Sequence, residues 1–107
     1  MKRKAIVITG GYLETNSAKT AHGLIRGSDR FEIVGIVDEK HAGKDAGEVL
    51  DGKNRNIPVY PSISDAVKKQ KAEFCVVGVA TKGGVIPESL RILLREALEN
   101  NLGIVNG

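Results

Sequence analysis

Five short apolar runs, rich in β-branched residues, alternate along the chain with segments whose apolar residues recur at helical spacing. This alternation is typical of a parallel sheet built from β-α-β units. Runs such as Val76-Val77-Gly78-Val79 are almost continuously apolar, which indicates strands buried on both faces. The predicted strands are, in chain order, Lys4 to Thr9, Phe31 to Val37, Ile57 to Tyr60, Phe74 to Val79 and Leu102 to Val105.

The segments between these runs predict helices. Ala18 to Arg26 carries its apolar residues on one face, and a short helix is expected after Ser62, whose hydroxyl can cap it. One helical turn is predicted over Gly47 to Leu50. The longest helix is predicted from Pro87 to Asn100, because proline suits a first helical turn. Its buried stripe is expected to comprise Leu90, Leu93, Leu94, Ala97 and Leu98.

Right-handed crossovers between consecutive parallel strands give the sheet order 3-2-1-4-5. The expected fold is therefore an α/β, Rossmann-like, doubly wound parallel sheet of about five strands, formed by residues 1–107 as a single domain. Val7, Ile36, Val77 and Ile104 should be buried in the sheet, with helices on both faces. Ligands of such sheets bind at the carboxyl ends of the strands, beside the point where the order reverses. The segments that reach this edge are Gly10 to Ser17, Asp38 to Lys44, and Ala80 to Ile86.

The first of these segments leads from the glycine pair Gly10-Gly11, through a polar loop ending at Ser17, to Lys19-Thr20 at a helix start. The first N–H groups of a helix have no intrahelical partner, and the helix dipole favours an anion there. This layout predicts a site for a phosphate-bearing ligand. The spacing matches neither the dinucleotide fingerprint nor the P-loop, so the alternative is that the glycines only let the chain leave the strand.

Asp38 closes the second predicted strand, where a carboxylate typically reaches a ribose hydroxyl in a dinucleotide fold. The nearby Lys40, His41 and Lys44 could instead bind a phosphate on the adenosine ribose, as NADP or coenzyme A would offer. If so, a ribose-phosphorylated cofactor should outcompete NAD. The alternative is that these are ordinary solvated side chains at a strand end.

The third candidate is Lys82-Gly83-Gly84, which follows the fourth predicted strand. Paired glycines let the backbone approach a ligand closely. The alternative is a flexible loop before Pro87.

Several classes of protein and site are disfavoured by composition. The net charge is only +3, and two Phe and two Tyr offer little base stacking, so nucleic acid is not an expected partner. Two histidines and the single Cys75 do not form a metal-ligand pattern, and no metal is expected. No apolar run is long enough for a signal peptide or a membrane span, and a lone cysteine suits a reducing compartment. We therefore expect a cytoplasmic protein without a membrane partner.

Two segments are fairly specific to a known family. They are Ala18-Lys19-Thr20-Ala21 and Ala42-Gly43-Lys44, within matching runs at residues 11–13, 18–26, 37–38 and 41–49. With them, nearly the whole chain resembles the N-terminal domain of a prokaryotic family long labelled as of unknown function. Members pair a Rossmann-like first domain with a P-loop second domain, and some are assigned as D-glutamate N-acetyltransferases.

The resemblance implies that residues 1–107 are the N-terminal domain of a longer protein. It also implies a C-terminal P-loop domain as partner, a homo-oligomer at full length, and an isolated domain that is inactive. A looser likeness, carried by Ile57 to Ser62, Asp65 to Val67 and Glu96 to Leu98, links the chain to the coenzyme A-binding domain of succinyl-CoA ligase α chains. That domain binds its cofactor through loops after strands one and four.

The favoured function is a nucleotide- or acyl-CoA-binding domain of a larger D-glutamate N-acetyltransferase-like enzyme, with acetyl-CoA or a nucleotide as ligand. The predicted binding residues are Gly10, Gly11, Ser17, Lys19, Thr20, Asp38, Lys44, Lys82, Gly83 and Gly84. No catalytic residue can be named. One alternative is a structural or oligomerisation module without its own ligand. The other is an NAD(P)-binding domain of an oxidoreductase, which rests on fold and Asp38 alone.

Overall fold

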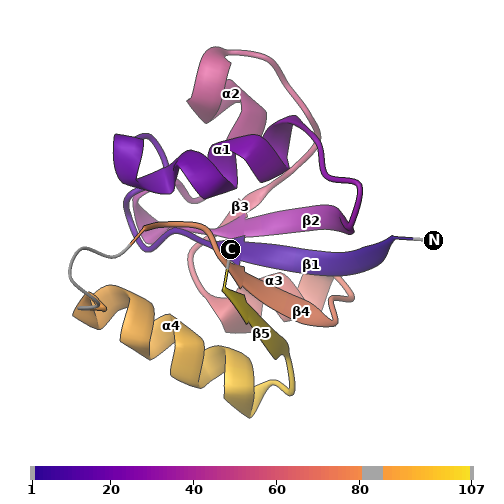
Figure 1. Ribbon diagram of the computed structural model, residues 1–107, viewed down its shortest axis with the longest axis vertical. Helices are drawn as coiled ribbons and strands as arrows, with labels where there is room; N and C mark the ends of the chain where they lie inside the picture. Colours follow the sequence, from indigo (N-terminus) through magenta and orange to yellow (C-terminus); the bar gives the residue numbers. More distant parts are fainter. Residues whose placement is uncertain (1, 81–85, 107) are drawn as a thin grey trace.

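A computed structural model describes residues 2–80 and 86–106 (Figure 1). Its centre is a five-stranded parallel sheet in the order β3-β2-β1-β4-β5. This confirms the doubly wound fold and the order expected from the sequence. The strands are β1 (Arg3–Ile8), β2 (Phe31–Val37), β3 (Val59–Tyr60), β4 (Phe74–Val77) and β5 (Gly103–Asn106).

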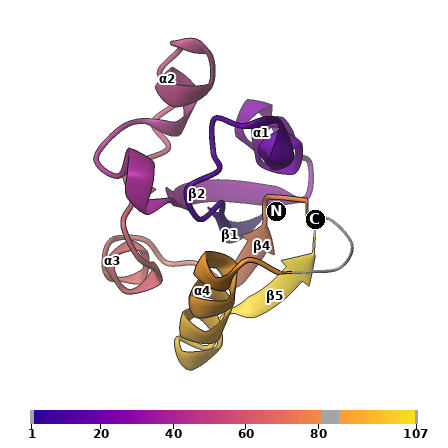
Figure 2. The same ribbon diagram turned by 90° about the vertical axis from the view of Figure 1, so that its left-hand side faces the viewer.

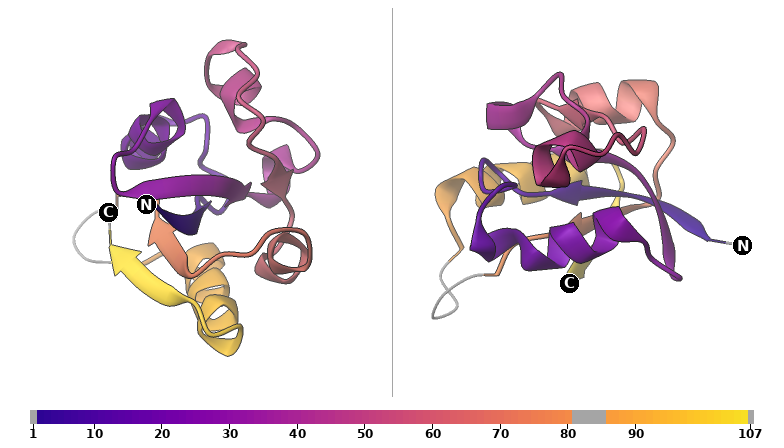
Figure 3. Two further views of the ribbon diagram at one scale, coloured as in Figure 1. Left: turned by 90° about the vertical axis from the view of Figure 1, so that its right-hand side faces the viewer. Right: turned by 90° about the horizontal axis from the view of Figure 1, so that it is seen from above.

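Helices cover both faces of the sheet, with α1 and α2 on one side and α3 and α4 on the other (Figures 2 and 3). The helices are α1 (Lys19–Arg26), α2 (Ala46–Asp51), α3 (Ile63–Lys69) and α4 (Glu88–Glu99), and 3-10 turns cover Asn16–Ala18 and Glu39–His41. Two of the starts are capped by the expected chemistry, because Ser62 accepts a hydrogen bond from Asp65 N and Asp45 accepts one from Glu48 N. None of the described helices is long and apolar enough to cross a membrane.

Two predicted strands are shorter than expected for identifiable reasons. In β3, the N–H of Ile57 donates to the Asp45 carboxylate at 2.8 Å instead of joining the sheet. In β4, the N–H of Gly78 still donates to Ile8 O of β1 at 3.0 Å, but the Gly78 carbonyl turns to α1 and accepts a hydrogen bond from Ala21 N at 3.1 Å. A Cβ at Gly78 would lie 2.9 Å from that of Ala21, so glycine is needed for this close approach.

The core lies around β1, whose residues Ala5 to Ile8 are fully buried. Val7 and Ile36 are buried as predicted, and Val77 is half-buried. The prediction for Ile104 is wrong. Ile104 is 39% exposed, because β5 lies at the edge of the described sheet. In α4, Leu90 and Ala97 are buried as predicted, but Leu98 is 63% exposed, so its place in the predicted buried stripe is wrong.

Candidate functional site

The loop after β1 turns back over the end of β2. Gly10 and Gly11 have φ angles of +54° and +97°, a left-handed backbone that favours glycine. The N–H groups of Thr9 and Gly10 both point to the Val37 carbonyl, at 3.1 and 3.5 Å. The glycine pair therefore redirects the chain from β1 across the end of β2.

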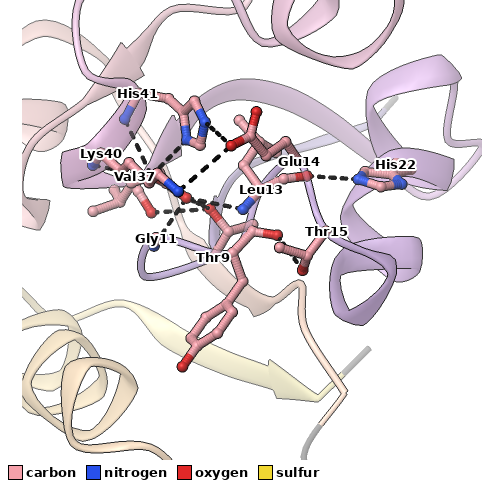
Figure 4. A network of polar contacts seen from close by, with 11 residues as sticks. Thr9, Gly11, Leu13, Glu14, Thr15, His22, Val37, Lys40 and His41 are labelled. Carbon is pink, nitrogen blue, oxygen red and sulfur yellow. Dashed lines mark hydrogen bonds and ion pairs between the residues drawn. The ribbon is translucent and has the colours of Figure 1, made fainter.

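Asp38 is the centre around which this loop folds. Figure 4 shows the loop residues Thr9, Gly11 and Leu13, which donate hydrogen bonds to its carboxylate. It is fully buried, and each carboxylate oxygen accepts three hydrogen bonds. On the loop side, Oδ2 accepts from Thr9 Oγ1 at 2.6 Å, Gly11 N at 2.9 Å and Leu13 N at 3.1 Å. On the other side, Oδ1 accepts from the N–H groups of Lys40 and His41 and from the His41 ring at 3.0 Å. A ribose hydroxyl would have to displace one of these donors.

The Asp38 carboxyl is held in its ionised form. Burial alone would raise its pKa, but hydrogen bonds from Thr9, His41, Leu13 and Gly11 outweigh burial and lower the pKa below the ordinary value. A buried carboxylate of this kind stabilises the fold only while its donors stay in place. Asp38 therefore fixes the shape of the candidate binding loop without any ligand.

Two histidines hold the same loop from either side. His22 of α1 donates to the Leu13 carbonyl through Nε2, at 2.6 Å. His41 is buried, with Nδ1 at 3.0 Å from Asp38 Oδ1 and Nε2 at 3.5 Å from Glu14 Oε1. Lys40 Nζ also lies 3.5 Å from that Glu14 oxygen. Contact with His41, and secondarily with Lys40, lowers the pKa of Glu14, while its slight burial opposes this.

The start of α1 lies against the backbone that follows β4. Ser17 accepts a hydrogen bond from Ala80 N through its carbonyl at 2.8 Å, and Ala21 N donates to Gly78 O. Lys19 is exposed and Thr20 is half-buried. Part of the predicted anion site is thus occupied by main chain, and the Lys19 side chain stays in solvent.

The remaining predicted binding residues are Lys44 and the segment Lys82-Gly83-Gly84. Lys44 lines a cavity of about 380 Å³ whose other lining residues are Glu14, His41, Glu48 and Val49. Lys82, Gly83 and Gly84 lie outside the described residues. The basic residues after β2 therefore gather beside Glu14, on the side of the sheet that carries α1 and α2.

The larger cavity, about 490 Å³, opens at the carboxyl ends of β1, β2 and β3 on the side of α4. Of the predicted site residues that the structure describes, Gly10 lines it. The lining residues are Gly10, Val37, Glu39, Pro61, Ser62, Ser89, Ile92, Leu93, Arg95, Glu96 and Glu99. Sequence reasoning missed most of them, although Arg95, Glu96 and Glu99 form a polar stripe at helical spacing beside the predicted apolar face.

One of these cavity-lining residues, Glu96, already accepts hydrogen bonds from the chain itself. The Glu96 carboxylate accepts hydrogen bonds from Ile63 N at 3.1 Å and from Ser64 Oγ at 2.8 Å, at the start of α3. Glu96 thus links α4 to the start of α3. Glu39, by contrast, is exposed at the end of β2 and adjoins the cavity.

Two kinds of chemistry find no support among the residues described. No group of three or more histidine, cysteine or acidic side chains there could hold a metal ion. The Cys75 thiol is buried in β4, and burial raises its pKa to about 12, so it is not a reactive thiolate at neutral pH.

Residues 39–107 match the model of DUF1611_N, a Rossmann-like domain of unknown function. The chain belongs to this family. The DUF1611_N fold also appears in the crystal structure of a DUF1611 family protein from Anabaena variabilis ATCC 29413, with a TM-score of 0.85 and 30% sequence identity. That likeness covers 99% of this chain, which spans 30% of the length of the Anabaena protein. A comparison with curated proteins finds no match.

Proposed function

We propose that this DUF1611_N domain binds an adenine nucleotide and contributes that site to a larger enzyme. The observation that carries the proposal is the 490 Å³ cavity at the carboxyl ends of three parallel strands. Doubly wound sheets bind their ligands at this edge. The resemblance noted from the sequence favours a D-glutamate N-acetyltransferase-like parent, in which a C-terminal P-loop domain and a second copy of the protein are the proposed partners.

Within this cavity, Glu39 is the proposed ribose-binding residue. It follows Asp38, whose oxygens are occupied by the chain itself, and it adjoins the cavity from the end of β2. A carboxylate accepts hydrogen bonds from two ribose hydroxyls but repels a phosphate attached to one of them. The cavity site therefore favours an adenine nucleotide with a free ribose, whereas acetyl-CoA, whose ribose carries a 3'-phosphate, would favour a site at Lys40 and Lys44.

Coenzyme A and dephospho-coenzyme A separate these two sites, because they differ only in the 3'-phosphate of the ribose. In calorimetry we expect dephospho-coenzyme A to bind at least as tightly as coenzyme A. We also expect Glu39→Gln to weaken the binding of dephospho-coenzyme A about tenfold, which corresponds to the loss of roughly one charge-assisted hydrogen bond. Glu32→Gln, a matched change at the opposite end of β2, should have no effect. A strong preference for coenzyme A, lost in Lys44→Ala, would place the ligand beside Lys44 instead.

Lys19 tests whether the start of α1 also takes part. If the ligand phosphate lies there, Lys19→Ala should weaken binding at low salt, where a phosphate contact is strongest. The melting temperature should not change, because the Lys19 side chain is exposed. Unchanged affinity would mean that the loop after β1 only lets the chain leave the strand. The α4 side of the sheet would then remain the proposed site.

A second candidate function is an interaction module. The observation that favours it is the exposure of apolar residues on α4 and β5: Ile92 is 58%, Leu98 63% and Ile104 39% exposed. A thermal-shift screen in which acetyl-CoA, NAD, NADP and adenosine all fail to raise the melting temperature would support this module. Any ligand at a hundredfold excess over its Kd should add about 2.7 kcal/mol of stability, which such a screen detects.

A further inference from the structure

The His41 ring lies between two carboxylates that come from different loops. Nδ1 is 3.0 Å from Asp38 Oδ1 at the end of β2, and Nε2 is 3.5 Å from Glu14 Oε1 in the loop after β1. The His41 side chain is 5% exposed, whereas that of Glu14 is 51% exposed. Figure 4 shows the His41 ring beside the Glu14 carboxylate. His41 thus connects a buried acid to a largely exposed one.

Hydrogen-bond chemistry fixes where the imidazole proton must be. Asp38 is ionised, so Oδ1 can only accept, and His41 Nδ1 must carry a hydrogen. A neutral imidazole has one N–H, and Nε2 would then present a lone pair to the Glu14 carboxylate. The contact between His41 and Glu14 is therefore attractive only when the imidazole is doubly protonated.

Other charged groups around this pair modify the contact. Lys40 Nζ lies 3.5 Å from the same Glu14 oxygen and is a second basic group beside it. Lys44 and Glu48 line the adjoining cavity and contribute opposite charges. Histidine is the side-chain type that ordinarily changes charge between about pH 5 and 8, and His41 is the histidine of this cluster.

We propose that His41 is a proton-operated latch on the loop after β1. When it is protonated, it holds Glu14 against the end of β2. When it is neutral, it stays bound to Asp38 through Nδ1–H and releases Glu14 into solvent. The hydrogen bonds from Gly11 N and Leu13 N to Asp38 persist in both states, so the latch acts on the Glu14 end of the loop and on the cavity beside Lys44.

NMR of the 107-residue chain without ligand tests the latch, and its result does not depend on the proposed function. Three-bond couplings should report a single Glu14 χ1 rotamer at about pH 5.5 and rotamer averaging at about pH 8.5. Lys40→Met is the matched control: it removes the other cation beside Glu14 and should leave this pH dependence in place. His41→Asn can still donate to Asp38 but cannot titrate, and should leave Glu14 averaged at both pH values.

Two results would overturn the latch. One is a Glu14 rotamer distribution that does not change with pH in the unsubstituted chain. The other is averaging at about pH 5.5 in Lys40→Met, which would show that the lysine holds Glu14. If His41→Asn fails to fold, Glu14→Gln replaces it, because that side chain is half exposed. The backbone amide at position 14 should shift with pH in the unsubstituted chain and should lose that shift in the Glu14→Gln variant.

Discussion

Replacing Asp38 by alanine should lower the free energy of unfolding by about 3–5 kcal/mol, which is typical when one partner of a buried charged network is removed. The substitution leaves the N–H groups of Gly11, Leu13 and Lys40 without their acceptor. For a domain of this size, the melting temperature should fall by more than about 10 °C, at about 4–8 °C per kcal/mol. Urea denaturation measures the change directly.

Two milder variants define what the carboxylate contributes. Thr9→Val removes one of the donors to Oδ2 without changing the shape of the side chain, and should cost about 1 kcal/mol. Asp38→Asn keeps one acceptor oxygen but turns an NH2 group toward three donors. Its loss of unfolding free energy should therefore lie between those of Thr9→Val and Asp38→Ala. Equal stability of Asp38→Asn and the unsubstituted chain would mean that the carboxylate is not the organising group.

Asp38 should make the free energy of unfolding decrease as the pH falls into the acid range. Asp38 has a lower pKa in the folded chain than in the unfolded one, so its ionised form stabilises the fold above the unfolded value of about 4. That contribution is lost as the pH falls through the folded pKa. Denaturation curves of the unsubstituted chain and Asp38→Asn should therefore converge in acid. A constant difference down to about pH 2 would contradict this linkage.

The sequence was sufficient for the fold because its signals are periodic. The β-branched runs placed all five strands, and the crossover rule then fixed their order. The exposure of Ile104 could not be predicted in the same way, since an apolar run does not reveal that its strand will stand at an edge. The short β3 likewise depends on a hydrogen bond between Ile57 and the distant Asp45.

The candidate site was less predictable because it depends on where individual side chains point. Asp38 and Glu39 are adjacent acids at the end of β2, and the sequence offers no way to tell which one turns inward. In the structure Asp38 is buried by the loop after β1, and Glu39 lines the cavity. The polar stripe on α4 lines that cavity together with Ser62, a pairing of distant segments that the sequence does not reveal.

Replacing Gly10 by valine should cost stability and ligand binding together. Gly10 has φ +54°, where a β-branched residue is strained by about 1–3 kcal/mol. A Cβ there would also lie 3.2 Å from Leu90 Cδ2 and from Ser89 Oγ, which adds about 1–3 kcal/mol of overpacking. Because Gly10 and Ser89 both line the 490 Å³ cavity, the new side chain should also reduce its volume and lower affinity for the proposed nucleotide.

Gly11→Val is the matched control, since Gly11 also has a positive φ of +97° but a Cβ there would meet no atom within 4 Å. It should therefore show the backbone strain alone and unfold at a lower urea concentration than the unsubstituted chain, but at a higher one than Gly10→Val. If the two variants are equally stable, Leu90 moves aside and the contact with α4 is unimportant. If Gly10→Val is less stable yet binds the nucleotide unchanged in calorimetry, the ligand does not occupy the cavity between Gly10 and α4.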